Sequence, residues 1–207
     1  MTVTEPGQEV VHAERTALKE WAVLVDAMAR GEFCAMIRKG GIREQRAGFA
    51  VRHDRFLLYP TFFHEKTDEL APTLRLHLAE AHDIRPPGGN IVISHAAKVS
   101  AVWRVTNLEA LRATDGEHGL AWEAVESRFY YRNNPGVHVV ALELSSLPTP
   151  VVIPETRRYL GCVSWVELDA PVSLSGATPV HNRDEVECRL SRLRAALGEP
   201  LRGEGGT

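Results

Sequence analysis

Strand-like segments come in pairs along this chain, and helix-like segments separate the pairs. A chain that alternates single strands with single helices folds into a parallel α/β sheet, whereas paired strands favour antiparallel neighbours. The order of segments therefore predicts an α+β fold, in which a mixed or antiparallel sheet, or an open barrel, has helices on its flanks.

Several stretches show the periodicity of amphipathic helices, in which apolar residues recur every three or four positions. The first helix is expected between Thr16, which can cap a helix start, and Gly31, which suits the left-handed residue that ends one. Residues 68–81, 108–113 and 120–129 are also expected to be helical.

The helix expected near the C-terminus has the most complete set of signals. Its apolar residues, within 186–197, fall at positions i, i+4, i+7 and i+11. Asn182 and Glu185 have the spacing of a capping box, and Glu185 and Arg189 have the spacing of an i, i+4 ion pair. Gly198 then ends the periodic pattern.

Short runs rich in β-branched and aromatic residues predict strands between these helices. Residues 99–106 alternate with a period of two, which is the pattern of a half-buried strand. Residues 151–153 lie between two prolines and are expected at the edge of a sheet. The expected strands cover residues 33–37, 56–59, 91–94, 99–106, 137–144, 151–153 and 163–168.

The length of the chain suits one domain, which we expect at residues 15–198, between a flexible arm at 1–14 and a flexible tail at 199–207. The first residues are polar and acidic and lack the apolar core of a signal peptide. No apolar run is long enough for a membrane helix, and the odd number of widely spaced cysteines predicts reduced thiols. These features predict a cytoplasmic protein without a membrane partner.

The overall charge argues against a uniformly basic nucleic-acid-binding protein, because the formal net charge is −3 and the pI is near 6.3. Between residues 30 and 66, however, eight basic residues stand against four acidic ones, so this segment carries a charge of +4. A binding surface and an ordinary solvated surface both explain this segment, and the two interpretations stay open.

The sequence lacks the common catalytic and metal-binding motifs. It has no nucleophile elbow, P-loop, zinc-protease helix, dinucleotide-binding glycine motif or C-x-x-C pair. Glu65 and Lys66 are adjacent, so on a strand they would point to opposite faces, unlike the acidic and basic pair of a restriction nuclease. We therefore expect no metal and no cofactor, and the balance leans against an enzyme.

A glycine turn between basic residues is the first part of a candidate binding site. Arg38 and Lys39 precede Gly40 and Gly41, and Arg43 follows them. The backbone N–H groups of such a turn can surround an anion, and arginine matches the geometry of phosphate or carboxylate. The alternative is a plain hairpin turn with solvated neighbours.

Two further polar groups complete the candidate site if the fold brings them together. Tyr59 and His64 follow the next expected strand, and Arg128 and Tyr131 end a later helix. Cations beside aromatic faces suit a phosphate and a stacked base. We expect Tyr59, His64, Tyr131 and Trp165 to line a base pocket beside the phosphate-binding cations.

Two alternatives to a binding site stay open. Cys162 follows Gly161 and could form a nucleophilic pair with His64, which would make the protein a small-molecule enzyme. The chain could instead be a structural module that binds a protein partner, with an exposed apolar patch as its mark.

Five segments, taken in order, resemble a bacterial family of unknown function, the DUF1802 family. They are Ala17–Trp21, Arg38–Glu44, Phe56–Thr61 with His64, Arg128–Tyr131 and Gly161–Leu168, and the resemblance spans roughly residues 15–195.

Some chains of that family are joined to an Mrr-type restriction endonuclease domain, so the resemblance implies a role near DNA restriction. Residues 1–207 contain no such nuclease domain. The expected order of elements is also similar to the PUA-like folds, which include the ASCH and EVE domains that bind RNA or modified bases. The expectation is therefore a non-catalytic domain that binds nucleic acid or a nucleotide.

Overall fold

The computed structural model describes residues 13–39, 53–83, 85–161 and 163–201, together with the backbone of two short strands between residues 44 and 49. Gly40, Gly41, Arg43 and Cys162 therefore lie outside the described residues, as do most of the expected arm and tail.

A mixed sheet forms the centre of the molecule, in the strand order β2-β7-β6-β5-β1-β8, with β9 paired to β7. Its neighbouring strands run antiparallel except for β1 and β5, which are parallel. The predicted α+β class with a mixed sheet is thus confirmed. The strands are β1 (Ala13–Trp21), β2 (Ala35–Arg38), β5 (Arg55–Thr61), β6 (Asn90–Val105), β7 (Val137–Pro154), β8 (Trp165–Ser173) and β9 (Thr178–Pro179), and a separate pair joins β3 (Glu44–Gln45) to β4 (Gly48–Phe49).

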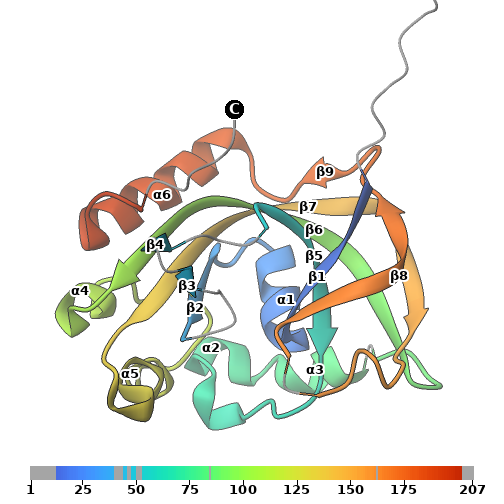
Figure 1. Cartoon of the computed structure of the whole chain (residues 1–207), viewed down its shortest axis with the longest axis horizontal. Helices are drawn as coiled ribbons and strands as arrows, with labels where there is room; N and C mark the ends of the chain where they lie inside the picture. The colour runs from blue at the N-terminus through green and yellow to red at the C-terminus, as the bar shows by residue number, and fades with distance from the viewer. Residues whose placement is uncertain are drawn as a thin grey trace, which may run out of the picture.

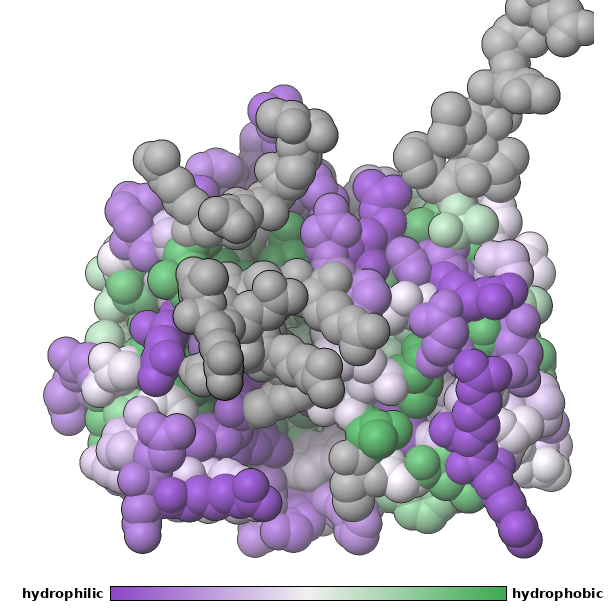
Figure 2. Space-filling view, viewed as in Figure 1, coloured by the Kyte–Doolittle hydropathy of each residue, from purple (hydrophilic) through white to green (hydrophobic). Residues whose placement is uncertain are grey.

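The sheet bends around helix α1 (Ala22–Ala29), as Figure 1 shows, and the remaining helices lie at its margins. On the face seen in Figure 2, hydrophilic side chains cover most of the described surface and leave small apolar patches between them. Among the described helices, none is long and apolar enough to cross a membrane. The other helices are α2 (Pro72–Arg75), α3 (Leu78–Asp83), α4 (Leu108–Arg112), α5 (Trp122–Tyr130) and α6 (Arg183–Leu197), with single 3-10 turns at η1 (Thr67–Glu69) and η2 (Tyr131–Asn133).

The expectation of one helix from Thr16 to Gly31 was wrong in its first half. Residues up to Trp21 form strand β1, which hydrogen-bonds to β5 on one side and β8 on the other. This tertiary pairing on both sides overrides the helical spacing of the apolar residues, because local propensity is weak beside tertiary contacts. Helix α1 begins only at Ala22, while Gly31 has the expected positive φ of 77°.

Strands β6 and β7 form one long antiparallel ladder where the sequence predicted four separate strands, and α4 and α5 lie in the connection between them. The register of this ladder shifts at two places, between Ile93 and His95 and between Val99 and Ala101. At the first, Ser94 alone on β6 stands opposite residues 147–150 of β7, so the prolines there make no ladder bonds. Residues 151–153 pair with β6 alone among the described strands, which confirms their place at an edge.

The helix expected over 68–81 is interrupted, because it is divided into η1, α2 and α3. The C-terminal helix α6 has the predicted capping box, with Asn182 and Glu185 exchanging backbone and side-chain hydrogen bonds. The expected pair of Glu185 with Arg189 is not what the structure shows. Arg189 reaches across to Glu117 at 3.2 Å, because that carboxylate is buried and needs a cation.

Two apolar clusters lie on the two faces of the sheet. Along β5, Phe56 and Leu58 belong to the larger cluster beneath α1, while Leu57 and Tyr59 belong to the smaller one against β8. Both faces of this strand are therefore buried, and its residues read as one continuous apolar run. The carboxyl end of β5 emerges from this packing at Thr61, beside the end of β1.

Candidate functional site

The main cavity, of about 510 Å³, opens where the parallel strands β1 and β5 end side by side. Trp21 pairs with Thr61 at that edge, so the residues near the ends of both strands face the same space. The opposite walls come from the end of β2, from α5 and from the segment that leads into β8. Parallel strands that end together leave their terminal side chains free to meet a ligand, which makes such an edge a common ligand position.

A second cavity, of about 350 Å³, continues from the first. Glu20, Arg38, Arg128 and Ser164 border both spaces, and Tyr131 lies at the far rim of the second one. The two cavities therefore form one groove, and its middle is lined by two arginines and one carboxylate.

Arg38, the last residue of β2, is held rigidly at the middle of this groove. Its Nη2 donates to the carbonyl oxygen of Lys19 at 2.7 Å and lies 3.2 Å from a carboxylate oxygen of Glu20. Its Nε is buried and has no hydrogen-bond partner within the described residues. A donor that is removed from water and left unpaired is costly, so the position of this guanidinium is set by its other contacts, to Lys19 and Glu20.

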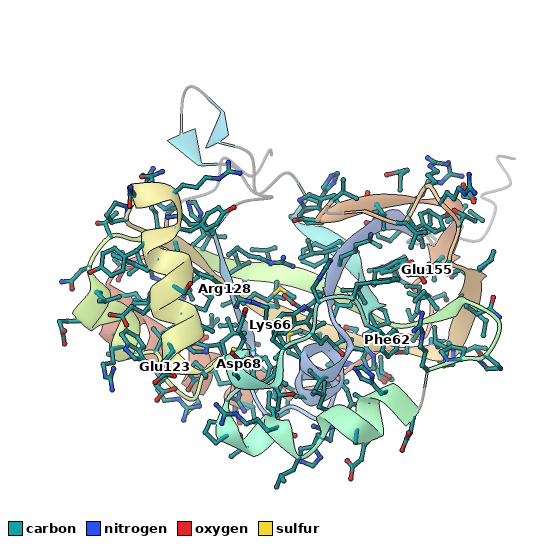
Figure 3. The ribbon with its side chains drawn as sticks, turned by 90° about the horizontal axis from the view of Figure 1, so that it is seen from below. Phe62, Lys66, Asp68, Glu123, Arg128 and Glu155 are labelled. Atoms are coloured by element: carbon teal, nitrogen blue, oxygen red, sulfur yellow. The ribbon has the colours of Figure 1, made fainter. Side chains whose placement is uncertain are left out.

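Arg128 reaches the groove from α5. Its Nη2 lies 3.2 Å from Glu69, and its guanidinium lies over the ring of Trp21, with 5.5 Å between Cζ and the ring centroid. Figure 3 shows Arg128 on the side of α5 that faces Lys66 and Asp68. Burial lowers the pKa of Arg128, the carboxylates of Glu20 and Glu69 raise it, and nearby Arg38 lowers it.

Glu69 is fixed in place by a short piece of backbone pairing. Leu70 bridges to Leu120, and the carbonyl oxygen of Glu69 accepts from the N–H of Ala121 at 2.9 Å. This pairing ties the segment before α2 to the start of α5, the helix that carries Arg128. The ion pair of Arg128 with Glu69 is therefore built into the fold.

His64 lies on a strained turn at the mouth of the main cavity. Its φ is +61°, which is unusual for a residue other than glycine, and its neighbours Thr61 and Phe63 also line the cavity. The N–H of Phe63 donates to the hydroxyl of Thr61 at 3.3 Å and helps to close the turn. Backbone strain of this kind concentrates at binding and catalytic sites, which is consistent with a functional position.

Lys39, one of the expected phosphate ligands, is engaged in holding the end of α5. Its Nζ donates to the carbonyl oxygens of Phe129 at 2.9 Å and Gly136 at 2.7 Å, and also to that of Asn134. Burial lowers its pKa, with a smaller contribution in the same direction from Arg104. Lys39 borders the second cavity, but three carbonyls already satisfy its ammonium group.

The structure brings Arg38, His64, Arg128 and Tyr131 together and places two other expected residues elsewhere. Tyr59 is fully buried in the smaller core cluster, where its hydroxyl donates to Glu155 at 3.3 Å; burial raises its pKa. Trp165 packs against Phe56, with ring centroids 5.0 Å apart, and against His53. Neither of the two borders the groove.

Sequence reasoning missed the groove residues contributed by β1, which are Lys19, Glu20 and Trp21. They were assigned to an amphipathic helix, and no local signal distinguished the strand. Cys162, the nucleophile of the alternative enzyme hypothesis, lies outside the described residues, but Gly161 and Val163 on either side of it line the main cavity together with His64.

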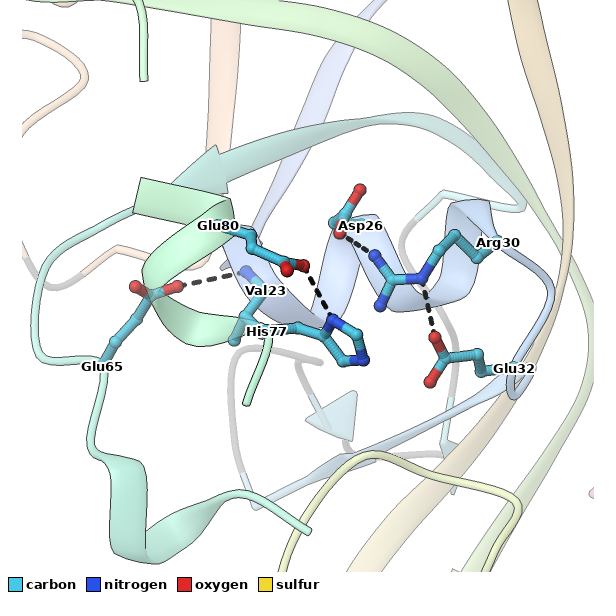
Figure 4. A network of polar contacts seen from close by, with 7 residues as sticks. All are labelled: Val23, Asp26, Arg30, Glu32, Glu65, His77 and Glu80. Atoms are coloured by element: carbon cyan, nitrogen blue, oxygen red, sulfur yellow. Dashed lines mark hydrogen bonds and ion pairs between the residues drawn. The ribbon is translucent and has the colours of Figure 1, made fainter. Parts of the chain in front are cut away.

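Glu65 has a structural role at the start of α1. Its carboxylate accepts from the N–H of Val23 at 3.3 Å (Figure 4). It also contacts His82, and the Glu65 side chain is 1% exposed. A carboxylate at a helix N-terminus stabilises the helix dipole and satisfies a free N–H group. Within the part of the chain that the structure describes, no group of three potential metal ligands is present.

A family model described as a domain of unknown function, DUF1802, matches residues 17–192. No curated protein matches the chain.

Among solved structures, a crystal structure of ASCH from Zymomonas mobilis is 13% identical, with a TM-score of 0.42, and the match covers 85% of this chain and 93% of that one. A mutant of the same protein is 11% identical, with a TM-score of 0.43, over 88% of this chain and 98% of that one. At this level of similarity, function has to be argued from the groove itself.

Proposed function

We propose that this chain, which belongs to the DUF1802 family, is a non-catalytic domain that binds a nucleotide or a segment of nucleic acid in the groove at the ends of β1 and β5. The observation that carries the proposal is that two arginines, Arg38 and Arg128, line one cavity of about 510 Å³, where Arg128 lies over the ring of Trp21. That volume lies within the range of small-molecule sites.

The arginine pair supports an anionic ligand. Arg38 is held by a backbone carbonyl and by Glu20, and Arg128 is held by Glu69, so neither guanidinium has to be ordered when a ligand binds. Guanidinium groups that line a cavity donate in the fork geometry that phosphate oxygens accept. The two carboxylates formally balance the two arginines, and Lys19 adds one further cation at the main cavity. This low net charge favours one phosphate group over a long polyanionic stretch.

The aromatic residues support a ring system next to that anion. Trp21, Phe63 and His64 border the main cavity, and Tyr131 lies at the far end of the groove with 53% of its surface exposed. Bases stack on aromatic side chains with little dependence on sequence. A nucleotide in the main cavity with a neighbouring base on Tyr131 would use both parts of the groove.

Because the chain resembles proteins that are joined to restriction nucleases, DNA is the first polymer to test. The compartment that we propose is the bacterial cytoplasm. RNA and free nucleotides are tested beside DNA.

Fluorescence polarisation with short labelled single- and double-stranded DNA and RNA, and competition by mononucleotides, tests the proposal at two salt concentrations. We expect binding that weakens as salt rises. Arg38→Gln and Arg128→Gln should each weaken it by about tenfold or more, because a hydrogen bond to a charged group contributes roughly 1.5–3 kcal/mol.

Arg112→Gln is the matched control. The Arg112 guanidinium lies 4.5 Å from the ring of Trp122, outside the groove, so this variant removes the same kind of arginine–tryptophan contact elsewhere. Absent binding at low salt, or binding that survives both groove variants, would refute the proposal.

A second candidate function is an enzyme that uses Cys162 with His64. The observation in its favour is that His64 and both neighbours of Cys162 line one cavity. A catalytic thiol has a lowered pKa and reacts quickly with iodoacetamide, so its alkylation rate decides between the two functions. Cys34 is the internal control, because burial raises its pKa to about 11.

A further inference from the structure

Another cavity, of about 270 Å³, lies behind the proposed nucleotide site. The end of β5 separates the two spaces: Thr61 and Phe63 face the nucleotide groove, while Pro60 and Phe62 face this cavity. In Figure 3, Phe62 lies well away from Arg128, the groove arginine. The two spaces are therefore distinct and share only a wall.

One face of α1 forms the apolar floor of this cavity. Ala22, Val25 and Ala29 occur at i, i+3 and i+7, so their side chains lie on one side of the helix. Two of the three are alanines, and their small side chains leave room against Phe62 and Val92. Water gains little from contact with such apolar walls, so the cavity favours an apolar ligand.

The irregularity in β6 adds two polar groups to the apolar wall. Consecutive residues of a regular strand point to opposite faces, yet Ser94 and His95 both border the cavity. The cause is the irregular pairing at Ser94, since Ile93 pairs with Val151 and the next ladder pair joins His95 to Ser146. The Ser94 hydroxyl lies 2.9 Å from Nδ1 of His95, so Nε2 of the same ring remains for another partner.

The charges around the cavity favour a neutral ligand. Burial lowers the pKa of His95, and the negative charge of Asp26 opposes this in part, so the imidazole is uncharged near neutral pH. Asp26 also borders the cavity, but its carboxylate is paired with Arg30 (Figure 4). Among the described lining residues there is no lysine or arginine, and Arg85, which lies over the ring of Phe62, is itself paired with a carboxylate.

We propose that this cavity is a second binding site, which takes a small, uncharged, mostly apolar ring compound whose single hydrogen-bonding group meets the Ser94–His95 pair. The site does not depend on the proposed nucleotide function, because it shares no side chain with the groove. An anionic ligand is disfavoured, since it would enter an apolar space beside the Asp26 carboxylate, where the nearby guanidinium groups of Arg30 and Arg85 are already paired with carboxylates.

Indole and quinoline are suitable probes, because one offers an N–H donor and the other a ring-nitrogen acceptor on similar apolar bodies. Binding is measured on the whole chain by saturation-transfer NMR and by calorimetry, and the His95 ring signals are followed by ¹H–¹³C NMR after assignment with His95→Gln. We expect at least one probe to bind and to shift the His95 signals. Indole-3-acetate, the anionic analogue, should bind more weakly.

Ala29→Leu fills the cavity from the helix side and should raise the Kd of the bound probe about tenfold or more. Ala195→Leu is the matched control, since it adds the same side chain to an exposed position of α6. If circular dichroism shows that Ala29→Leu is misfolded, Ser94→Ala takes its place and should weaken binding while the His95 signals still respond at higher probe concentration.

No binding of either probe would overturn the proposal, as would binding that leaves the His95 signals unchanged or that survives the cavity variant. None of these measurements uses a nucleotide, so a failure here is distinguishable from a failure of the proposed function.

Discussion

Removal of the negative charge of Glu20 should strengthen the binding of an anionic ligand while it weakens the fold. The Glu20 carboxylate lies 3.2 Å from Arg38 and borders both parts of the groove, and its charge raises the pKa of Arg128. It therefore stabilises the arginines in the empty protein and repels a bound phosphate. Glu20→Gln keeps the side-chain oxygen that accepts from the N–H of Trp21 and removes only the charge.

The size of the effect follows from Coulomb's law. Two unit charges about 5 Å apart interact by about 3 kcal/mol at an effective dielectric constant of about 20. Solvent and salt reduce this in a half-open groove to about 1 kcal/mol, which corresponds to roughly fivefold tighter binding. The lost ion pair with Arg38 should cost about 1 kcal/mol of folding free energy and lower the Tm by about 2–4 °C.

Fluorescence polarisation at low and moderate salt measures the change in affinity, and calorimetry measures the Tm. The control is Glu187→Gln, because Glu187 pairs with Arg194 at 3.3 Å on the exposed side of α6, away from the groove. Weaker binding by Glu20→Gln, or the same gain in the control, would show that the groove does not receive the anion.

Three other outcomes are expected. Gly119→Ala should destabilise the fold by about 1–3 kcal/mol in denaturant titration, because a Cβ there would lie 2.5–2.7 Å from three core side chains; an unchanged midpoint would contradict this packing. In timed alkylation followed by mass spectrometry, exposed Cys188 should react well before buried Cys34, and a Cys162 faster than both would favour the enzyme hypothesis. Burial lowers the pKa of His118 to about 4, so below pH ~6.5 the unfolded chain binds more protons than the folded chain. The free energy of unfolding should therefore fall as the pH drops from about 6.5 towards 4. His118→Gln should flatten that decline in acid-unfolding curves, and an equally steep decline would rule His118 out as its source.

The groove shows how far residue types alone could predict a site. Arg38 and Arg128 are recognisable in the sequence as basic residues at the ends of a strand and a helix, and the structure places both at the groove. Trp21 was not recognisable, because apolar spacing around it matches a helix as well as it matches a strand. Tyr59 was expected to line a base pocket, but the neighbouring strands bury it.

The apolar cavity behind the groove could not be predicted from the sequence for a related reason. It depends on Ser94 and His95 facing the same side, and only the unequal numbers of residues on β6 and β7 produce that arrangement. The prolines of β7 indicate that its strand pairing is interrupted, but Ser94, which faces that interruption, belongs to β6.

The sequence by itself determined the α+β class, most of the strands and helix α6 with its capping box, because these depend on interactions within a few residues. Only the tertiary structure decided that residues before Trp21 form a strand, since its partners, Leu57 and Trp165, pair with Ala17 and Leu18 across long distances in sequence. The groove depends on the same long-range pairing. Hydrogen bonds between distant strands form cooperatively with burial of the core, and no local pattern specifies which strands will meet.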